Sequence, residues 1–349
     1  MKNLFFSLLM GLVILSSISC KAKQNKGDKD GKTEKVASGE EGSSSKIKIG
    51  YVYAMANAPL IIADKKQLFT KQGIGVITRK YTSGPVLFKG LVTKNLDIAY
   101  VGFPPTYHWH AKGLPVTVIA KVNYGQHVIL VKEKSGINKL EDLKNKKIAG
   151  VKKGSGTDVL LRGYVLQELA KLDLKDVRVK HLKSAVMGAA LDSGSVDAAF
   201  TWEPFTSQYL LRTGYKTIFN LLDKVPKYPW YVIVVRNEFL KKHRDKVIKV
   251  LKAHQEAIDI LNSDPEGANR IIANAFKISP IKVNGKEISS AEIVKEARKR
   301  VGFQAQFVEA DMKFFADLMK YSKSLGFLKK NMKPEDLVDR SLLKEAGIK

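Results

Sequence analysis

One segment of this chain is written twice, and the repeat restricts the fold more than any other feature. The stretch LDIAYVGFPPT, residues 96–106, returns as VDAAFTWEPFT at residues 196–206. Asp97, Pro104 and Thr106 of the first copy each recur 100 positions later. Because the period is the size of a domain and there are two copies, the repeat indicates two related units and not a solenoid.

Short apolar segments alternate with amphipathic segments on both sides of the repeat. Strands are expected at residues 46–53, 75–82, 96–102 and 114–122, and again at 146–153, 177–183, 196–202 and 215–222. Helices are expected at residues 58–73, 84–95, 104–113, 156–172, 184–194 and 203–214. Strands that alternate with helices form βαβ units, so we predict an α/β protein with two similar lobes and mostly parallel sheets.

The first 20 residues have the pattern of a secretory signal peptide. A single lysine precedes an apolar run over residues 4–15, and small residues lead to Cys20. The run is too short to cross a bilayer as a helix. Cys20 is the sole cysteine, so no disulfide forms within one molecule. A lone cysteine here resembles the lipobox of bacterial lipoproteins, and we interpret Cys20 as a lipidation site; an ordinary signal peptide with an incidental cysteine is the alternative.

The following segment differs from the rest of the chain in composition. Residues 21–45 contain one large apolar residue among charged and small ones. Such a segment cannot bury enough apolar surface to fold, and we interpret it as a flexible tether. We divide the remainder into lobe one, residues 46–125 with 236–349, and lobe two, residues 126–235.

The chain is strongly basic. Lysine and arginine outnumber aspartate and glutamate by 60 to 34, which gives a formal charge of +26. Such an excess favours anionic partners. The basic residues are scattered, however, and no zinc-finger, RNA-recognition or basic-zipper pattern accompanies them. We therefore predict no nucleic-acid partner, and a solvated lysine-rich surface is favoured over a dedicated polyanion-binding face.

The two copies of the repeat differ at the turn after the strand, where Gly102-Phe103 becomes Trp202-Glu203. Ligands of open α/β sheets bind beyond the carboxyl ends of the strands, so these four residues are expected to line one cleft. Gly102 would let the backbone approach a ligand, Phe103 and Trp202 would form apolar walls, and Glu203 would supply a charge. The alternative is that Trp202 belongs to the core and Glu203 caps the helix begun by Pro204.

Two helix starts form a candidate oxyanion site. In KKGSGTDVLL, residues 152–161, a strand runs through Gly-Ser-Gly-Thr directly into a helix, and YTSGPV, residues 81–86, is the matching element of lobe one. Free N–H groups and hydroxyls at such starts can hold an anion, although a plain N-cap uses the same residues. The lysines precede the glycines, so this is not a Walker A loop. The predicted contacts here are Thr82, Ser83, Ser155, Gly156 and Thr157.

Other constellations carry less chemistry. Asn57, in the turn after the first strand, is a further predicted ligand contact. Trp230 and Tyr231 lie near a predicted crossover and either line the cleft or pack at the hinge. His108 and His110 would point apart on a helix, so we predict no metal site. The chain lacks a Gly-x-Ser-x-Gly elbow, a His-Glu-x-x-His helix and a cysteine nucleophile, so we predict no cofactor and no catalysis.

Taken together, four segments are similar to the nitrate/sulfonate/taurine family of periplasmic-type solute-binding proteins, which serve ABC importers. They are SGPVLFKGLVTKNLDIAYVGFPP, LEDLKNKKIAGVKKGSGTDVLL, SGSVDAAFTWEPF and FLKKHRDKVIKVLKAHQEAIDIL. The resemblance implies a type II periplasmic binding protein architecture with hinge crossovers, an anionic ligand held at helix starts, and no catalysis. KKGSG is most similar to the aliphatic-sulfonate branch. The resemblance does not extend to residues 280–349, which we expect to form helices that pack on lobe one.

Three classes of function remain open. The first is a monomeric, lipid-anchored binding protein outside the cytoplasm that delivers a sulfonate, taurine or nitrate-like anion to an ABC permease and meets the membrane through its anchor only. The second is a binding protein or enzyme for the pyrimidine precursor of thiamine, since proteins of that branch resemble this fold. The enzyme is expected to have a cysteine-rich iron motif, and this chain has one cysteine. The third is a ligand-sensing surface lipoprotein.

Overall fold

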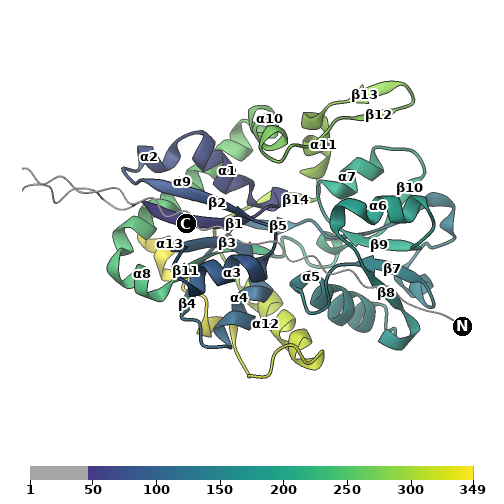
Figure 1. Ribbon diagram of the computed structural model, residues 1–349, viewed down its shortest axis with the longest axis horizontal. Helices are drawn as coiled ribbons and strands as arrows, with labels where there is room; N and C mark the ends of the chain where they lie inside the picture. Colours follow the sequence, from purple (N-terminus) through teal and green to yellow (C-terminus); the bar gives the residue numbers. More distant parts are fainter. Residues whose placement is uncertain (1–45, 349) are drawn as a thin grey trace, which may run out of the picture. The chain divides into compact units, whose positions relative to one another are not determined.

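The computed structural model describes residues 46–348 (Figure 1). The predicted signal peptide with Cys20 and the predicted tether lie outside the described residues. No helix within residues 46–348 is both long and apolar enough to cross a membrane.

The first sheet has the strand order β2-β1-β3-β11-β4. Its strands are β1 (Ile47–Val52), β2 (Val76–Tyr81), β3 (Ile98–Gly102), β4 (Val116–Lys121) and β11 (Tyr231–Arg236). Strand β1 is parallel to β2 and β3, and β11 runs antiparallel between β3 and β4. Strands β1 to β4 therefore all point the same way.

The second sheet repeats this arrangement with the order β10-β6-β9-β7-β8. Its strands are β6 (Val128–Lys132), β7 (Lys147–Gly150), β8 (Arg178–His181), β9 (Ala198–Thr201) and β10 (Tyr215–Asn220). Strand β7 is parallel to β8 and β9, and β6 runs antiparallel between β9 and β10. The prediction of two similar, mostly parallel sheets is confirmed.

The repeated aspartates explain why one motif is written twice. The Asp97 carboxylate accepts a hydrogen bond from Lys48 N at 2.9 Å, and the Asp197 carboxylate accepts one from Lys147 N at 2.7 Å. Each aspartate directly precedes one strand, β3 or β9, and binds the backbone of the parallel neighbouring strand, β1 or β7. The repeat specifies this local join in both sheets.

Each sheet receives its antiparallel strand from a chain crossover. We placed residues 231–235 in lobe two, but β11 lies in the first sheet, where Tyr231 pairs with Gly102. The first lobe therefore begins again before β11 and not at residue 236. Strand β6, which the repeat does not predict, is the corresponding strand of the second sheet.

Helices cover the sheets in both lobes. In lobe one they are α1 (Ala58–Lys65), α2 (Leu68–Lys71), α3 (Gly84–Val92), α4 (Phe103–His110), α8 (Asn237–Lys242), α9 (Arg244–Ser263) and α10 (Pro265–Ala275), preceded by the short turn η1 (Met55–Asn57). In lobe two they are α5 (Gly156–Val159), which continues as the π-helix η4 (Leu160–Leu169), α6 (Ser184–Asp192) and α7 (Phe205–Leu210). The helix expected at 58–73 is interrupted at Gln67, whose φ of 55° lies in the left-handed region.

The C-terminal segment joins both lobes. It contains β12 (Ile281–Val283), β13 (Lys286–Ile288), α11 (Ser290–Ala297), β14 (Val301–Phe303), α12 (Glu309–Ser324) and α13 (Ser341–Glu345). Helix α13 packs on lobe one as expected, but α11 contacts α7, and α12 contacts α4, α5 and η4. Strand β14 also pairs with β5 (Asn123–Gly125) at a crossover. Residues 280–349 therefore pack on lobe one, as expected, and also on lobe two.

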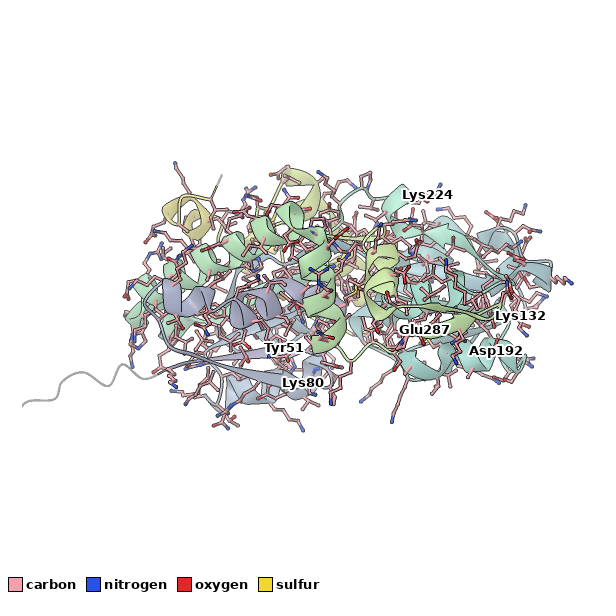
Figure 2. All side chains as sticks on the ribbon, turned by 90° about the horizontal axis from the view of Figure 1, so that it is seen from above. Tyr51, Lys80, Lys132, Asp192, Lys224 and Glu287 are labelled. Carbon is pink, nitrogen blue, oxygen red and sulfur yellow. The ribbon has the colours of Figure 1, made fainter. Side chains whose placement is uncertain are left out.

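Basic side chains are spread over the described surface. Figure 2 shows nitrogen-tipped side chains around the whole outline of the folded part, without a single gathered face. At the end of β6 in the second sheet, Lys132 Nζ donates to the carbonyl of Asp192 at 2.8 Å (Figure 2). This distribution agrees with the expected solvated, lysine-rich surface.

Candidate functional site

The carboxyl ends of the two sheets lead to the residues predicted to bind a ligand. Strand β3 runs into α4 at Gly102-Phe103, and β9 runs through Trp202-Glu203 towards α7. Helices α4 and α5 start against each other, because a Cβ atom built at Gly156 would lie 2.7 Å from Pro104 Cγ. The two lobes therefore touch at this point.

Two of the predicted contacts in lobe one have structural roles in this arrangement. Phe103 is fully buried, and its ring stacks on Phe315 of α12 with centroids 3.6 Å apart. A Cβ atom at Gly102 would lie no closer than 3.7 Å to Pro105, and the φ of Gly102 is −60°. The backbone at Gly102 therefore does not require glycine, and Phe103 packs on the C-terminal helix.

Glu203 is buried in an ion-pair network. Its Oε1 lies 2.5 Å from Arg300 Nε, and its Oε2 accepts hydrogen bonds from Ser207 N at 3.1 Å and Ser207 Oγ at 2.6 Å. Burial raises the pKa of Glu203, against the lowering effect of Arg300 and Ser207. Both oxygens are occupied and the carboxylate caps α7, as in the alternative reading, so Glu203 offers no free charge to a ligand here.

The predicted oxyanion loop of lobe two contains its own carboxylate. Ser155 Oγ accepts from Asp158 N at 3.3 Å, which makes Ser155 the N-cap of α5. Asp158 in turn accepts from Gly154 N at 2.9 Å and pairs with Arg162 Nε at 2.7 Å. The N–H groups of Gly154 and Asp158, which we expected to be available to an anion, are therefore already bonded within the loop. Thr157 is half-buried beside it.

The matching element of lobe one has fewer internal contacts. Ser83 is the N-cap residue of α3 but makes no capping hydrogen bond with its side chain. Ser83 is half-buried and Thr82 is exposed. Their hydroxyls remain candidates for a ligand.

The sequence interpretation missed an aromatic cluster centred on His127. The imidazole is fully buried, with the Trp230 ring at 4.4 Å, Phe200 at 5.4 Å and Trp202 at 6.2 Å between centroids. Tyr228 Oη lies 2.8 Å from His127 Nδ1 and accepts from His127 N at 2.9 Å. Burial lowers the pKa of His127 to about 3, so the ring is neutral at physiological pH. The signal in the sequence that could have identified His127 is its position just after a predicted crossover between the lobes.

Several buried polar atoms at the crossovers and strand ends have no hydrogen-bond partner within the described residues. We call them the unpaired site atoms: Asn57 Oδ1, Asn123 Nδ2, Gln126 Oε1, His127 Nε2, Thr201 Oγ1 and Thr206 Oγ1. They come from both lobes and from the segments that connect them: Asn57 lies in η1, Asn123 in β5, Thr201 in β9 and Thr206 in α7, and η1 contacts both β5 and β14. An unpaired buried polar atom costs roughly 1–3 kcal/mol, so each of these atoms requires a partner such as a ligand or an ordered water.

This region brings together some of the predicted site residues. Asn57 contributes an unpaired site atom, and the half-buried Trp202, which follows Thr201 in the chain, belongs to the aromatic cluster around His127. No group of three or more metal-ligating side chains occurs within residues 46–348. The arrangement can bind a small polar ligand through neutral groups.

Comparison with known proteins identifies the fold. A model of the NMT1-like family matches residues 40–276. A *Bacillus subtilis* (strain 168) protein named for binding aliphatic sulfonates is 29% identical over 295 residues, which cover 79% of this chain and 86% of the relative. An *Escherichia coli* (strain K12) protein of the same name is 25% identical, over 68% of this chain and 73% of its own.

Solved structures give the same result. The periplasmic aliphatic sulphonate binding protein SsuA from *Escherichia coli* has a TM-score of 0.73 at 21% identity and covers 85% of this chain and 93% of its own. The periplasmic nitrate-binding protein NrtA from *Synechocystis* PCC 6803 has a TM-score of 0.68 at 16% identity and covers 87% and 89%. The predicted periplasmic binding protein fold and the resemblance to sulfonate- and nitrate-binding proteins are confirmed. The relatives are named as binding proteins and not as enzymes, in agreement with the expected absence of catalysis.

Proposed function

Because this chain belongs to the NMT1-like family, we propose that it is the substrate-binding protein of an ABC importer and captures a small anion between its two lobes. The observation that carries this proposal is the set of unpaired site atoms, which come from both lobes and from the crossovers between them. A ligand that pairs with atoms from both lobes stabilises the closed arrangement over an open one. The names of the relatives support a sulfonate or a nitrate-like ion as the ligand.

Ligand binding tests the proposal directly. We expect calorimetry on the purified protein to detect binding of at least one of taurine, propane-1-sulfonate and nitrate. Small-angle scattering at saturating ligand should show a radius of gyration no larger than that of the free protein, since the ligand favours closure. Binding of none of these anions would contradict the proposal.

The aromatic cluster favours one second candidate. His127, Trp202 and Trp230 present flat rings beside neutral hydrogen-bonding groups, which also suit a pyrimidine such as the thiamine precursor. The same calorimetry therefore includes 4-amino-5-hydroxymethyl-2-methylpyrimidine. Binding of this compound alone would replace the anion as ligand.

The proposed location is the outer face of a cell membrane, with the protein anchored as a monomer through a lipid on Cys20. Support comes from the signal-peptide pattern, the sole cysteine and the polar segment that follows it. One acyl chain binds membranes only marginally, so stable anchoring needs several. Replacing Cys20→Ser should release soluble protein with unchanged ligand affinity. Wild-type protein found wholly in the soluble fraction with an unmodified N-terminus would contradict the anchor.

A further inference from the structure

We infer that the ligand carries an N–H hydrogen-bond donor in addition to its anionic oxygens, and that Asn57 Oδ1 accepts from this N–H. The inference rests on the proposed function, because it concerns the ligand of the same site. Among the anions considered above, it selects an amino-substituted sulfonate over a plain alkanesulfonate or nitrate.

The orientation of the Asn57 amide is determined by its neighbours. Its Nδ2 lies 2.7 Å from the carbonyl oxygen of Val52 and 3.4 Å from that of Tyr100. Carbonyl oxygens only accept hydrogen bonds, so the amide nitrogen must occupy this position. The amide oxygen is then the free atom, and it is buried without a partner because Asn57 is 0% exposed. An oxyanion has no donor for this oxygen and would be repelled by it.

Other unpaired site atoms are donors that suit the anionic part. Asn123 Oδ1 accepts from Tyr231 N at 2.9 Å, which leaves Asn123 Nδ2 as a free donor. The Tyr228 hydroxyl has no recorded acceptor within residues 46–348 other than His127 Nδ1, so its hydrogen belongs there and the neutral imidazole carries its own hydrogen on Nε2. The two free donors, Asn123 Nδ2 and His127 Nε2, lie on neutral groups.

The unpaired site atoms therefore include hydrogen-bond donors and an acceptor, and the acceptor carries no charge. We expected Glu203 to pair with a ligand ammonium, but Arg300 and Ser207 occupy its carboxylate. An amino group must instead be recognised by a neutral oxygen such as Asn57 Oδ1. The half-buried Trp202 ring adds a surface on which a cation is favourable.

The test compares two ligands of the same shape. Propane-1-sulfonate has a methyl group where taurine has an ammonium group, and both carry the same sulfonate. Calorimetry on the wild-type protein should give tighter binding of taurine by roughly tenfold to a hundredfold, the value of one hydrogen bond to a charged donor. In Asn57→Leu this ratio should fall towards one. The ratio isolates the N–H contact, because a general loss of stability weakens both ligands alike.

Asn269→Leu is the matched control. Asn269 is also a buried asparagine, 5% exposed on α10, and its Oδ1 accepts from Arg298 at 3.1 Å. This variant should keep the wild-type ratio. Equal affinities of the two ligands for the wild type, or an unchanged ratio in Asn57→Leu, would overturn the inference and leave the proposed function standing. Binding of neither sulfonate would overturn the inference, and the proposed function would fall with it only if nitrate does not bind either.

Discussion

Arg300 Nε lies 2.5 Å from Glu203 Oε1, and this ion pair joins the C-terminal segment to lobe two. Arg300 Nη2 also donates to Ser207 Oγ at 2.9 Å, and Arg300 Nη1 lies 3.2 Å from Glu296 Oε1. Arg300 directly precedes β14, which pairs with the crossover strand β5. Side chains of the chain itself therefore hold the C-terminal segment against lobe two.

Removing Arg300 should lower the stability of the protein and weaken the attachment of the C-terminal segment to lobe two. Arg300→Met leaves the buried Glu203 carboxylate without its cation, which typically costs about 3–5 kcal/mol. The double variant Arg300→Met/Glu203→Gln removes the stranded charge and should recover most of this loss. Urea unfolding measures the stabilities. If Arg300→Met has the same free energy of unfolding as the wild type, the ion pair does not stabilise the contact between the C-terminal segment and lobe two.

Two glycines provide a matched test of lobe contact. A Cβ atom at Gly156 would lie 2.7 Å from Pro104 Cγ, whereas one at Gly102 would lie no closer than 3.7 Å to any neighbour outside its own turn. Gly156→Ala should push α5 away from α4 and weaken ligand binding by about tenfold, as overpacking does. Gly102→Ala should bind like the wild type. Equal affinities of both variants, measured by calorimetry, would rule out the contact as a requirement for closure.

A buried ion pair fixes α12 to the first sheet. Lys121 Nζ lies 2.7 Å from Asp311 Oδ2, and the two side chains are 0% and 3% exposed. Burial lowers the pKa of Lys121, and Asp311 opposes this shift. Lys121→Met should destabilise the protein by about 3–5 kcal/mol because it strands the carboxylate.

A second substitution separates the charge from the packing of this pair. Asp311→Asn in the Lys121→Met background removes the charge and can still accept the hydrogen bond from Val308 N. Most of the stability should return in urea unfolding. An equal loss in the single and double variants would assign the effect to packing of the lysine stem.

Buried histidines should make the fold sensitive to acid. Burial lowers the pKa of His127 to about 3 and that of His108 and His254 to about 4. Each ring takes up a proton near pH 6.5 when unfolded but stays neutral when folded, so the unfolded state binds more protons below that pH. Their contribution is fully present above about pH 6.5 and is lost as the pH falls towards the folded pKa, by up to about 1.4 kcal/mol per pH unit for each histidine.

Urea unfolding between about pH 7.5 and pH 4.5 measures this dependence. His254→Gln removes one of the three groups and should make the curve shallower. The wild type measured under the same conditions is the reference. A slope that is the same in His254→Gln and in the wild type would exclude His254 as a source of acid sensitivity.

The alternation of strands and helices along the chain predicted most strands of both sheets. Strand and helix periods recur in each half, and the repeated Asp97 and Asp197 bind the backbone of neighbouring strands. The strand and helix periods depend on residues that are close along the chain or on one face of one element, so a pattern can record them. The two aspartate bonds span 49 and 50 residues, and in the sequence only the repeat of the motif marks them.

Long-range packing set which segments cross between the lobes and which distant residues meet at the strand ends. Residues 231–236 joined the first sheet, Phe315 reached Phe103, and Arg300 reached Glu203. The unpaired site atoms likewise became a group only through long-range packing around His127 and Trp230. Periodicity indicates which side of an element is buried but not which distant residue covers it, because that choice depends on the packing of the whole chain.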